Sequence, residues 1–223
     1  IPVGRGMVVA LTRMTRILDI DPMNRSATVE PGVINLDVTK AAAQHGLFYA
    51  PDPSSQKACC IGGNIAENSG GAHCLAYGLT TNHVLAIEVA LPGGEVVWLG
   101  DPTGQEPGYD LRGVFIGSEG TLGIVTKAVL RLLPAPETIT TLLAVFDQTD
   151  HASAAVSAVI AAGIVPAAVE MMDRLAIQAV EASLHAGYPR DAAAVLLIEL
   201  DGLRETVDEQ AQAVAAICEA QHA

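Results

Sequence analysis

The stretch from Pro51 to Gly71 limits what this chain can fold into more than any other part of the sequence. It reads PDPSSQKACCIGGNIAENSGG. A proline-rich turn is thus followed by two glycine pairs, at 62–63 and 70–71, with Asn64 directly after the first pair and Asn68 two positions before the second. Proline fixes the backbone φ angle, whereas glycine adopts positive φ and lets another group approach the main chain closely. The stretch therefore predicts either a cradle built from backbone atoms or a long, ordered surface turn.

Further glycines favour the cradle. Gly78 and the segment 117–126, GSEGTLGIVT, add turns of the same kind downstream. Successive backbone N–H groups in such turns bind anions without help from a cation, and between residues 51 and 126 the only Lys or Arg residues are Lys57 and Arg112. A pyrophosphate bound there would depend on main-chain donors and on the side chains of Ser54, Ser55, Asn64, Asn68 and Ser69. The plain alternative is that the glycines only mark loops.

Composition and motif content exclude several classes of function. A net charge of −13 argues against a broad basic surface for nucleic acid. The glycines at 117, 120 and 123 are spaced GxxGxxG and precede a strand pattern, which argues against a Rossmann site for NAD. There is no GxxxxGK[ST], HExxH or GxSxG motif.

The four cysteines are too few and too irregularly spaced for a disulfide scaffold. A zinc site at Cys59, Cys60, His73 and Cys74 would lack the usual CxxC spacing, so we expect free thiols and no metal. His83 is expected to be structural rather than a ligand. No signal peptide or membrane span is visible, and a reducing, cytoplasmic location is the expectation.

The order of strands and helices predicts an α+β protein of two parts. Pro92-Gly93-Gly94 between two apolar runs is a β-hairpin signature, and Pro134-Ala135-Pro136 is a candidate boundary. This divides the chain into residues 1–134 and 135–223. In the second part, strand and helix patterns alternate, which favours helices packed on one face of a sheet. Expected helix caps are Asn35, Asp173 and a capping box that begins at Thr206.

The motifs resemble those of the FAD-linked oxidases of the vanillyl-alcohol-oxidase type. The resemblance lies in Pro51-Asp-Pro-Ser-Ser55, Ile61-Gly-Gly-Asn64, Asn68-Ser-Gly-Gly71, Tyr77-Gly78 and the segment 117–126. Within that family the branch that holds the D subunit of glycolate oxidase, D-lactate dehydrogenase and D-2-hydroxyglutarate dehydrogenase is the most similar. The resemblance implies the second subdomain of a PCMH-type FAD-binding domain, with a mixed sheet and flanking helices, over residues 1–134. Residues 135–223 would be part of a ferredoxin-like α+β cap domain on the substrate side.

The resemblance also implies which residues bind FAD. The residues expected along the pyrophosphate and ribityl chain are Pro51, Asp52, Ser54, Ser55, Gly62, Gly63 and Asn64. The flavin end would be approached by Asn68, Ser69, Gly70, Gly71 and Gly78. The backbone of Gly120, Gly123, Ile124 and Val125 would meet the adenine side.

The implied chemistry is hydride removal from the α-carbon of a D-2-hydroxy acid to FAD. Reoxidation would be by a quinone, a dye or an electron-transfer protein, and a hetero-oligomer or a homodimer would fit as the assembly. The isoalloxazine carries the chemistry, while the protein supplies orientation and electrostatics.

Two departures from the family pattern are visible. The family has a further FAD-binding lobe before the region that this sequence resembles, and only residues 2–6 resemble part of that lobe. The family also has a DGNxH segment further downstream, which this sequence does not contain. We therefore expect a fragment that is inactive alone, and assign no catalytic residue. Two alternatives stay open: a subunit or interaction module that keeps the fold without flavin, and an FAD oxidase that acts on another alcohol or a sugar lactone.

Overall fold

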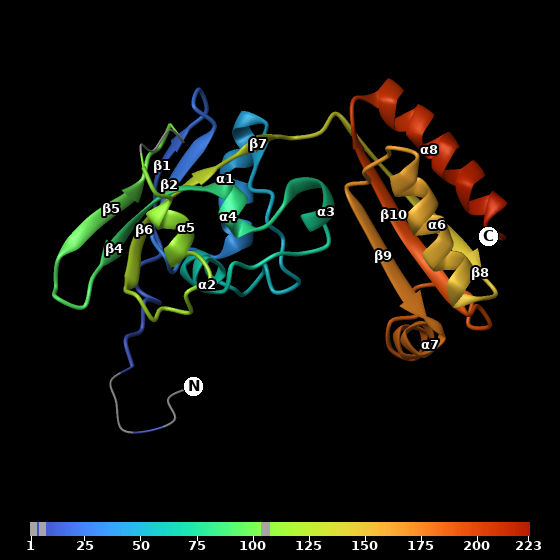
Figure 1. The fold of residues 1–223 in the computed structure, drawn as a ribbon, viewed down its shortest axis with the longest axis horizontal. Helices are drawn as coiled ribbons and strands as arrows, with labels where there is room; N and C mark the ends of the chain where they lie inside the picture. Colours follow the sequence, from blue (N-terminus) through green and yellow to red (C-terminus); the bar gives the residue numbers. More distant parts are fainter. Residues whose placement is uncertain (1–3, 5–7, 104–107) are drawn as a thin grey trace. The chain divides into compact units, whose positions relative to one another are not determined.

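The computed structural model describes residue 4 and residues 8–103 and 108–223, so most of the predicted remnant at 2–6 lies outside the described residues. The chain forms two compact units (Figure 1). The N-terminal unit comprises residues 1–71 and 78–135, and the C-terminal unit comprises residues 72–77 and 136–223. The short segment 72–77 therefore leaves the N-terminal unit, contributes to the C-terminal unit, and returns.

The N-terminal unit is built on a five-stranded sheet within the described residues, in the order β1-β2-β6-β4-β5. The strands are β1 (Ile17–Asp21), β2 (Ser26–Val29), β4 (Val84–Ala90), β5 (Val96–Gly100) and β6 (Ile124–Arg131). Every strand pair described in it is antiparallel, so the expected mixed pairing is wrong although the α+β class is confirmed. Short turns after β1 and β4 join neighbours as hairpins, which permits only antiparallel pairing.

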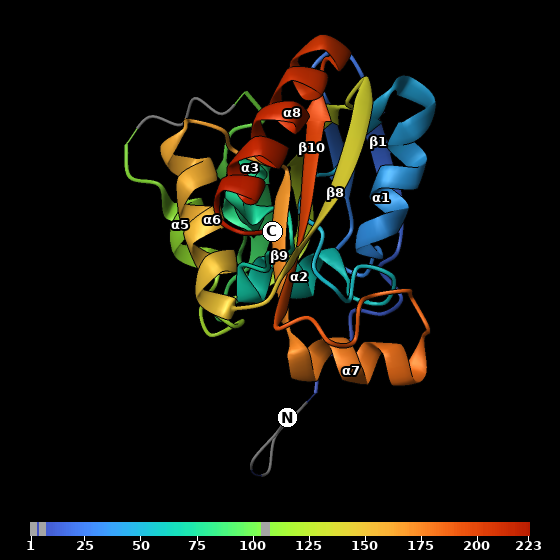
Figure 2. The ribbon, with the colours of Figure 1, turned by 90° about the vertical axis from the view of Figure 1, so that its right-hand side faces the viewer.

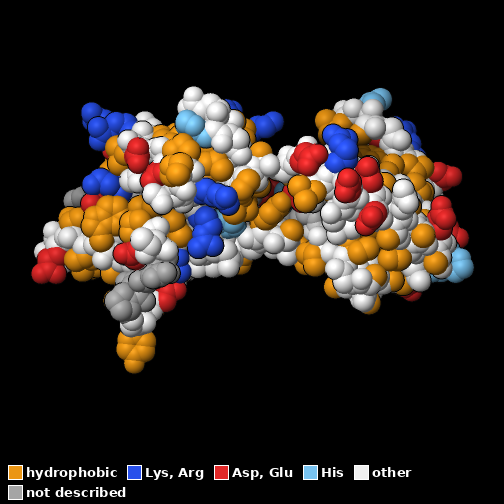
Figure 3. Space-filling model, turned by 90° about the horizontal axis from the view of Figure 1, so that it is seen from above, with side chains coloured by type: hydrophobic (Ala, Val, Ile, Leu, Met, Phe, Trp, Pro, Cys, Tyr) orange, Lys and Arg blue, Asp and Glu red, His pale blue; other side chains and the backbone are white. Residues whose placement is uncertain are grey.

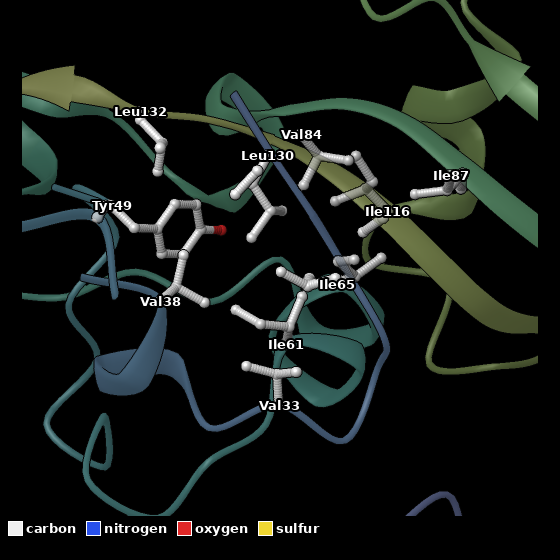
Figure 4. Close-up of a cluster of buried hydrophobic side chains, with 14 of the residues drawn as sticks. Val33, Val38, Tyr49, Ile61, Ile65, Val84, Ile87, Ile116, Leu130 and Leu132 are labelled. Atoms are coloured by element: carbon white, nitrogen blue, oxygen red, sulfur yellow. The ribbon is translucent and has the colours of Figure 1, made fainter. Parts of the chain in front are cut away.

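Helices pack on this sheet around one apolar core, which Figure 4 shows. They include α1 (Asn35–Ala42) with its 3₁₀ extension η1 (Ala43–His45), α2 (Ile61–Glu67) and α4 (Thr80–His83). Ile61 and Ile65, one helical turn apart on α2, are fully buried against Val84, Ile87 and Leu130 of the sheet. Two further strands, β3 (Leu47–Phe48) and β7 (Leu133–Pro134), form a small sheet of their own, and α5 (Leu111–Phe115) precedes β6.

Two local predictions in this unit are wrong. The N-cap of α1 is Ile34, and Asn35 is instead buried with its side-chain amide donating to the Pro51 carbonyl at 3.0 Å. Gly62 and Gly63 lie in the first turn of α2 rather than in a loop. Burial of Ile61 and Ile65 drives helix formation here, because tertiary packing of an apolar face outweighs the low helix propensity of glycine.

The C-terminal unit is a three-stranded antiparallel sheet, in the order β8-β10-β9, within the described residues. Its elements are α3 (Cys74–Tyr77), β8 (Thr138–Phe146), α6 (Thr149–Ala161), β9 (Ala168–Asp173), α7 (Arg174–Ser183), β10 (Ala194–Gly202) and α8 (Arg204–Ala220). Helices α6 and α8 cover one face (Figure 2), where Leu196, Ile198 and Leu200 are buried, whereas α7 packs by Ile177 against Val195.

The order of elements in this unit agrees with the expected α+β layer, since α6 connects β8 to β9 and β10 inserts between them. Asp173 caps α7 as predicted, with its carboxylate accepting from the Ala176 N–H at 2.8 Å. The predicted capping box at Thr206 is wrong, because α8 already begins at Arg204 with Leu203 as its N-cap. Val207 is fully buried, so packing of this first turn, rather than a side-chain cap, fixes where the helix begins.

Charge is distributed unevenly between the units. The C-terminal unit contains only Arg174, Arg190 and Arg204 as Lys or Arg residues, and Figure 3 shows Asp and Glu gathered on its visible face. The Lys and Arg residues that this view shows lie mainly on the N-terminal unit. The acidic balance of the sequence is therefore concentrated in the C-terminal unit.

The pairing of β4 with β6 gives a prediction about acid stability. Glu88 lies opposite Lys127 and accepts from its ammonium at 2.9 Å and from the Thr126 hydroxyl at 2.8 Å. The hydrogen bond from Lys127 is the main cause that holds the pKa of Glu88 below its usual 4.5, and the bond from Thr126 adds to it. A carboxylate with a depressed folded-state pKa stabilises the protein above its unfolded pKa, and this contribution is lost as the pH falls through the folded pKa.

We therefore expect Glu88→Gln to reduce the free energy of unfolding at pH 7 and to flatten its decline below about pH 4.5. Urea denaturation between about pH 3 and pH 7 measures both effects. Glu95→Gln is the matched control, because Glu95 is exposed in the β4–β5 hairpin and has no ion pair among the described residues. Equal pH profiles for Glu88→Gln and the unchanged protein would contradict the assigned role of this carboxylate.

Candidate functional site

Two hydrogen bonds join two glycine motifs. The first motif is helix α2, which contains Gly62 and Gly63, and the second motif is the segment 117–123. The Gly117 N–H donates to the Ile65 carbonyl at 2.8 Å, and the Glu119 N–H donates to the Ala66 carbonyl at 2.9 Å. The segment 117–123 is thereby held along the last turn of α2, although the two motifs lie far apart in the sequence. Gly117, Glu119 and Gly120 all have positive φ, which curls this segment around its hydrogen bonds.

A groove of about 160 Å³ opens between these two segments. From α2 it is lined by Gly62, Ile65 and Ala66, and from the second motif by Ser118, Gly120, Gly123, Ile124 and Val125. Val9, Leu11 and Phe115 complete the lining, so no charged side chain of the described residues lines the groove. Its walls are apolar and its polar groups belong mostly to the backbone.

The groove includes some of the predicted site residues and not others. Gly62, Gly120, Gly123, Ile124 and Val125 line it. The remaining predicted residues, which are Pro51, Asp52, Ser54, Ser55, Gly63, Asn64, Asn68, Ser69, Gly70, Gly71 and Gly78, lie outside its lining but in the same unit. The structure thus brings the start of α2 and the second motif together, and leaves the proline-rich turn apart from the groove.

Several of the predicted glycines are required by packing within the chain. A Cβ atom at Gly71 would lie 2.1 Å from the Asp52 carbonyl oxygen, and one at Gly62 would lie 2.6 Å from the Pro31 side chain. A Cβ at Gly123 would lie 2.7 Å from Val89, and Gly78 has φ +82 beside the Asn82 side chain. These four glycines therefore bring two chain segments into contact, whatever else they do.

Gly63 and Gly120 are different, because a Cβ atom at either would meet no atom within 4 Å. Neither backbone N–H has an acceptor among the described residues. Unpaired donors beside open space are what an acceptor-rich ligand requires. These two positions, on opposite motifs, have the geometry expected of main-chain contacts to a ligand.

Asn64 adds a side-chain donor to this set. The residue is 2% exposed, and its amide nitrogen Nδ2 has no hydrogen-bond partner among the described residues. Leaving a buried amide donor unpaired costs about 1–3 kcal/mol, so a native structure normally supplies an acceptor. Gly63, Gly120 and Asn64 thus each have an unpaired donor, the kind of group that would bind the oxygen and nitrogen acceptors of a pyrophosphate or a flavin.

Asn68 and Ser69 fasten the loop that follows α2. Asn68 has φ 51, and its Oδ1 accepts from the Thr81 N–H at 2.9 Å. The Ser69 carbonyl accepts from both the N–H and the hydroxyl of Thr80, at 3.0 and 2.7 Å. The side-chain oxygen of Asn68 is thus used within the protein, where it helps to fix the loop that follows α2.

The proline-rich turn is fixed by a hydrogen bond from Asn35, a residue that the sequence analysis predicted only as a helix cap. Asn35 is 1% exposed and donates to the Pro51 carbonyl, while Ser54 and Ser55 are exposed. The Ser55 carbonyl accepts from the N–H groups of Ala58 and Cys59, which closes the turn. No local pattern could have revealed the Asn35 contact, because its two residues are 16 positions apart.

Cations contribute little to the site. The Arg112 guanidinium donates to the Val84 carbonyl and forms an ion pair with Asp110 at 3.1 Å. Hydrogen bonds from Arg112 and from the Gly113 N–H hold the pKa of Asp110 below its usual range. Lys57 is exposed on the turn. A ligand in the groove would therefore be held by dipoles rather than by formal charge.

The histidines and cysteines do not form a metal centre in the part of the chain that the structure describes. None of the four cysteines, all of which lie in the described part of the chain, forms a disulfide. His83, at the end of α4, is 3% exposed and meets the ring of Tyr49 edge-on at 6.2 Å. Burial raises the pKa of the Tyr49 phenol. None of the described helices has the length and apolar character needed to cross a membrane.

Comparison with known proteins identifies both parts of the chain. Residues 2–100 match the FAD binding domain family, and residues 135–223 match the C-terminal domain of FAD linked oxidases. The chain is 50% identical over 214 residues to the glycolate oxidase subunit GlcD of Escherichia coli K12, covering 96% of this chain and 43% of that protein. It is 35% identical over 212 residues to the D-lactate dehydrogenase of Anaerostipes hadrus, covering 92% and 44%.

Among solved structures, an alkyldihydroxyacetonephosphate synthase superposes with a TM-score of 0.83 at 23% identity. That likeness covers 99% of this chain and 45% of the synthase chain, and at this identity it shows a shared fold. The chain spans less than half the length of the curated relatives it matches.

Proposed function

This chain belongs to the FAD-linked oxidases, and from that premise we propose that the whole protein oxidises a D-2-hydroxy acid of the glycolate, D-lactate or D-2-hydroxyglutarate class with FAD. The observation that carries the proposal is the pairing of α2 with the segment 117–123 around a groove, with an unpaired main-chain donor at Gly120 in its lining and another at Gly63 on α2. The likeness to glycolate oxidase subunits and D-lactate dehydrogenase supports the substrate class.

In this proposal the residues of the chain bind and orient FAD, and bound FAD supplies the acceptor for the hydride of the substrate α-carbon. The N–H groups of Gly63 and Gly120 and the side-chain amide of Asn64 donate hydrogen bonds to it. Gly62, Gly123, Ile124 and Val125 supply an apolar wall that excludes water and strengthens those hydrogen bonds. The loop 68–71, fixed by Thr80 and Thr81, defines how closely the flavin end approaches.

The proline-rich turn has a supporting role in the proposal. Pro51, Asp52, Ser54 and Ser55 are proposed to lie along the pyrophosphate and ribityl chain, with Ser54 and Ser55 exposed and therefore open to a ligand. Gly70, Gly71 and Gly78 complete the flavin side. We assign no residue of this chain as the catalytic base, because no His, Glu or Lys side chain of the described residues lines the groove.

The partners in this proposal follow from the chemistry. A reduced flavin must pass its electrons on, so a quinone, a dye or an electron-transfer protein is the acceptor, and a hetero-oligomer or homodimer is the proposed assembly. Four cysteines without a disulfide fit a reducing compartment, for which the cytoplasm is the proposed location.

The proposal is tested on the full-length protein. We expect the visible absorption bands of oxidised flavin, and their loss when glycolate, D-lactate or D-2-hydroxyglutarate is added without oxygen. L-Lactate is the matched control, because it differs from D-lactate only in the configuration of the carbon that loses hydride. A colourless protein that takes up no added FAD would contradict the proposal. Bleaching only by a simple alcohol or a sugar lactone would contradict the substrate class.

A further inference from the structure

A second cavity of the N-terminal unit, of about 510 Å³, lies where the β1–β2 turn, the end of β6 and the loop after β5 meet. Among the described residues it shares no lining residue with the groove beside α2. All of its lining residues belong to the N-terminal unit. They are Asp21, Asn24, Arg25, Ser26, Leu85, Pro102, Thr103, Arg131, Leu132 and Leu133.

Two arginines on paired strands line this cavity. Arg131 is the register partner of Ser26 in the pairing of β6 with β2, and the carbonyl of the preceding residue, Arg25, accepts from the Leu132 N–H at 2.7 Å. Cross-strand partners have Cα atoms about 4.5–5.5 Å apart, so the two arginines are near neighbours. Both are exposed, and neither guanidinium forms an ion pair or a hydrogen bond with another described residue.

Asp21 is the only acid among the described lining residues, and the β1–β2 turn already uses its carboxylate. Asn24 donates to it from its N–H at 3.0 Å and from its Nδ2 at 2.6 Å. Cations therefore outnumber acids in this cavity, although the chain as a whole has a net charge of −13. Neighbouring like charges repel one another, and an anion bound between Arg25 and Arg131 would offset that repulsion.

The other lining groups indicate what kind of anion would fit. Guanidinium groups present forked N–H donors that match the oxygens of a carboxylate or a phosphate. The Ser26 hydroxyl, on the same strand pair, is a further donor. Leu85 and Leu132 are buried and form an apolar wall. Sites for small molecules commonly measure about 300–1,000 Å³, so the volume suits a small molecule rather than a segment of a partner protein.

We propose that this cavity binds a small anion with two oxyanion groups, phosphate or carboxylate, through Arg25 and Arg131. The anion lies between the two guanidinium groups, and the Ser26 hydroxyl donates to it. The site is separate from the groove that the two glycine motifs form, so it goes beyond the proposed oxidation and does not depend on the binding of FAD.

Isothermal titration calorimetry of the full-length protein, saturated with FAD, tests the proposal with inorganic pyrophosphate and, separately, with malonate at constant ionic strength. FAD is added so that pyrophosphate cannot bind in place of the cofactor. We expect one-to-one binding, and the anion that binds more tightly identifies phosphate or carboxylate as the recognised group. Arg25→Gln and Arg131→Gln should each weaken binding about tenfold, because each removes charge-assisted hydrogen bonds. Arg131→Lys keeps the charge without the forked geometry and should retain part of the affinity.

Arg13→Gln is the matched control, because Arg13 is exposed in the same unit and is not among the described residues that line the cavity. Circular dichroism checks that each variant is folded, which we expect because both arginines are exposed.

Absence of binding by both anions would overturn the proposal, and so would affinities that Arg25→Gln and Arg131→Gln leave unchanged. An equal loss in Arg13→Gln would also overturn it, because net charge alone would then account for binding. If the protein takes up no FAD, the proposed function fails, whereas the same comparison of variants on the protein as purified still decides whether Arg25 and Arg131 bind the anion.

Discussion

Replacing Gly71 with alanine is expected to destabilise the N-terminal unit by about 3 kcal/mol or more. The new Cβ would lie 2.1 Å from the Asp52 carbonyl oxygen and 2.5 Å from its carbon, so backbone rather than a flexible side chain would have to shift. Forcing those segments apart would disturb the closure of the whole stretch 51–71. Urea denaturation of Gly71→Ala, followed by circular dichroism, measures the loss.

Gly63→Ala is the matched control, because it lies in the same stretch and its Cβ would meet no atom within 4 Å. Since alanine has the higher helix propensity, this change is expected to leave the free energy of unfolding unchanged or to raise it by about 0.5–1 kcal/mol. Equal stabilities for Gly71→Ala and Gly63→Ala would show that the close contact with Asp52 does not constrain the fold.

The second large effect concerns the cofactor rather than stability. Gly63→Leu is expected to leave the apoprotein folded, because the space beside Gly63 is open and leucine is a good helix former. If FAD occupies that space, the side chain must displace it or shift it. A steric cost of about 1–3 kcal/mol corresponds to a loss of about fivefold to 150-fold in affinity. Titration of the full-length apoprotein with FAD, followed by flavin fluorescence, measures the loss.

Gly93→Leu is the control for this experiment, since Gly93 also borders open space but lies in the β4–β5 hairpin rather than on α2, the helix that contributes Gly62, Ile65 and Ala66 to the groove. It should not alter FAD affinity. Full affinity in Gly63→Leu, with the protein folded, would remove Gly63 from the proposed site and would leave Gly120 and Asn64 as the donors to be tested next.

Much of the architecture was predictable from local sequence. The hairpin at 92–94, the strands of the C-terminal unit and the Asp173 cap depend on residues only a few positions apart, and each is present in the structure. Local patterns failed where burial decided the outcome. Burial of Ile61 and Ile65 places Gly62 and Gly63 in a helix. Asn35 does not cap its helix and instead donates a hydrogen bond to Pro51.

The sequence by itself determined that this chain is an α+β protein whose glycine motifs are those of an FAD-linked oxidase, because motif order and spacing are local properties of the chain. Only the tertiary structure decided what each glycine does. Gly71 and Gly63 are the same residue type in the same stretch, yet one is pressed against Asp52 and the other borders open space.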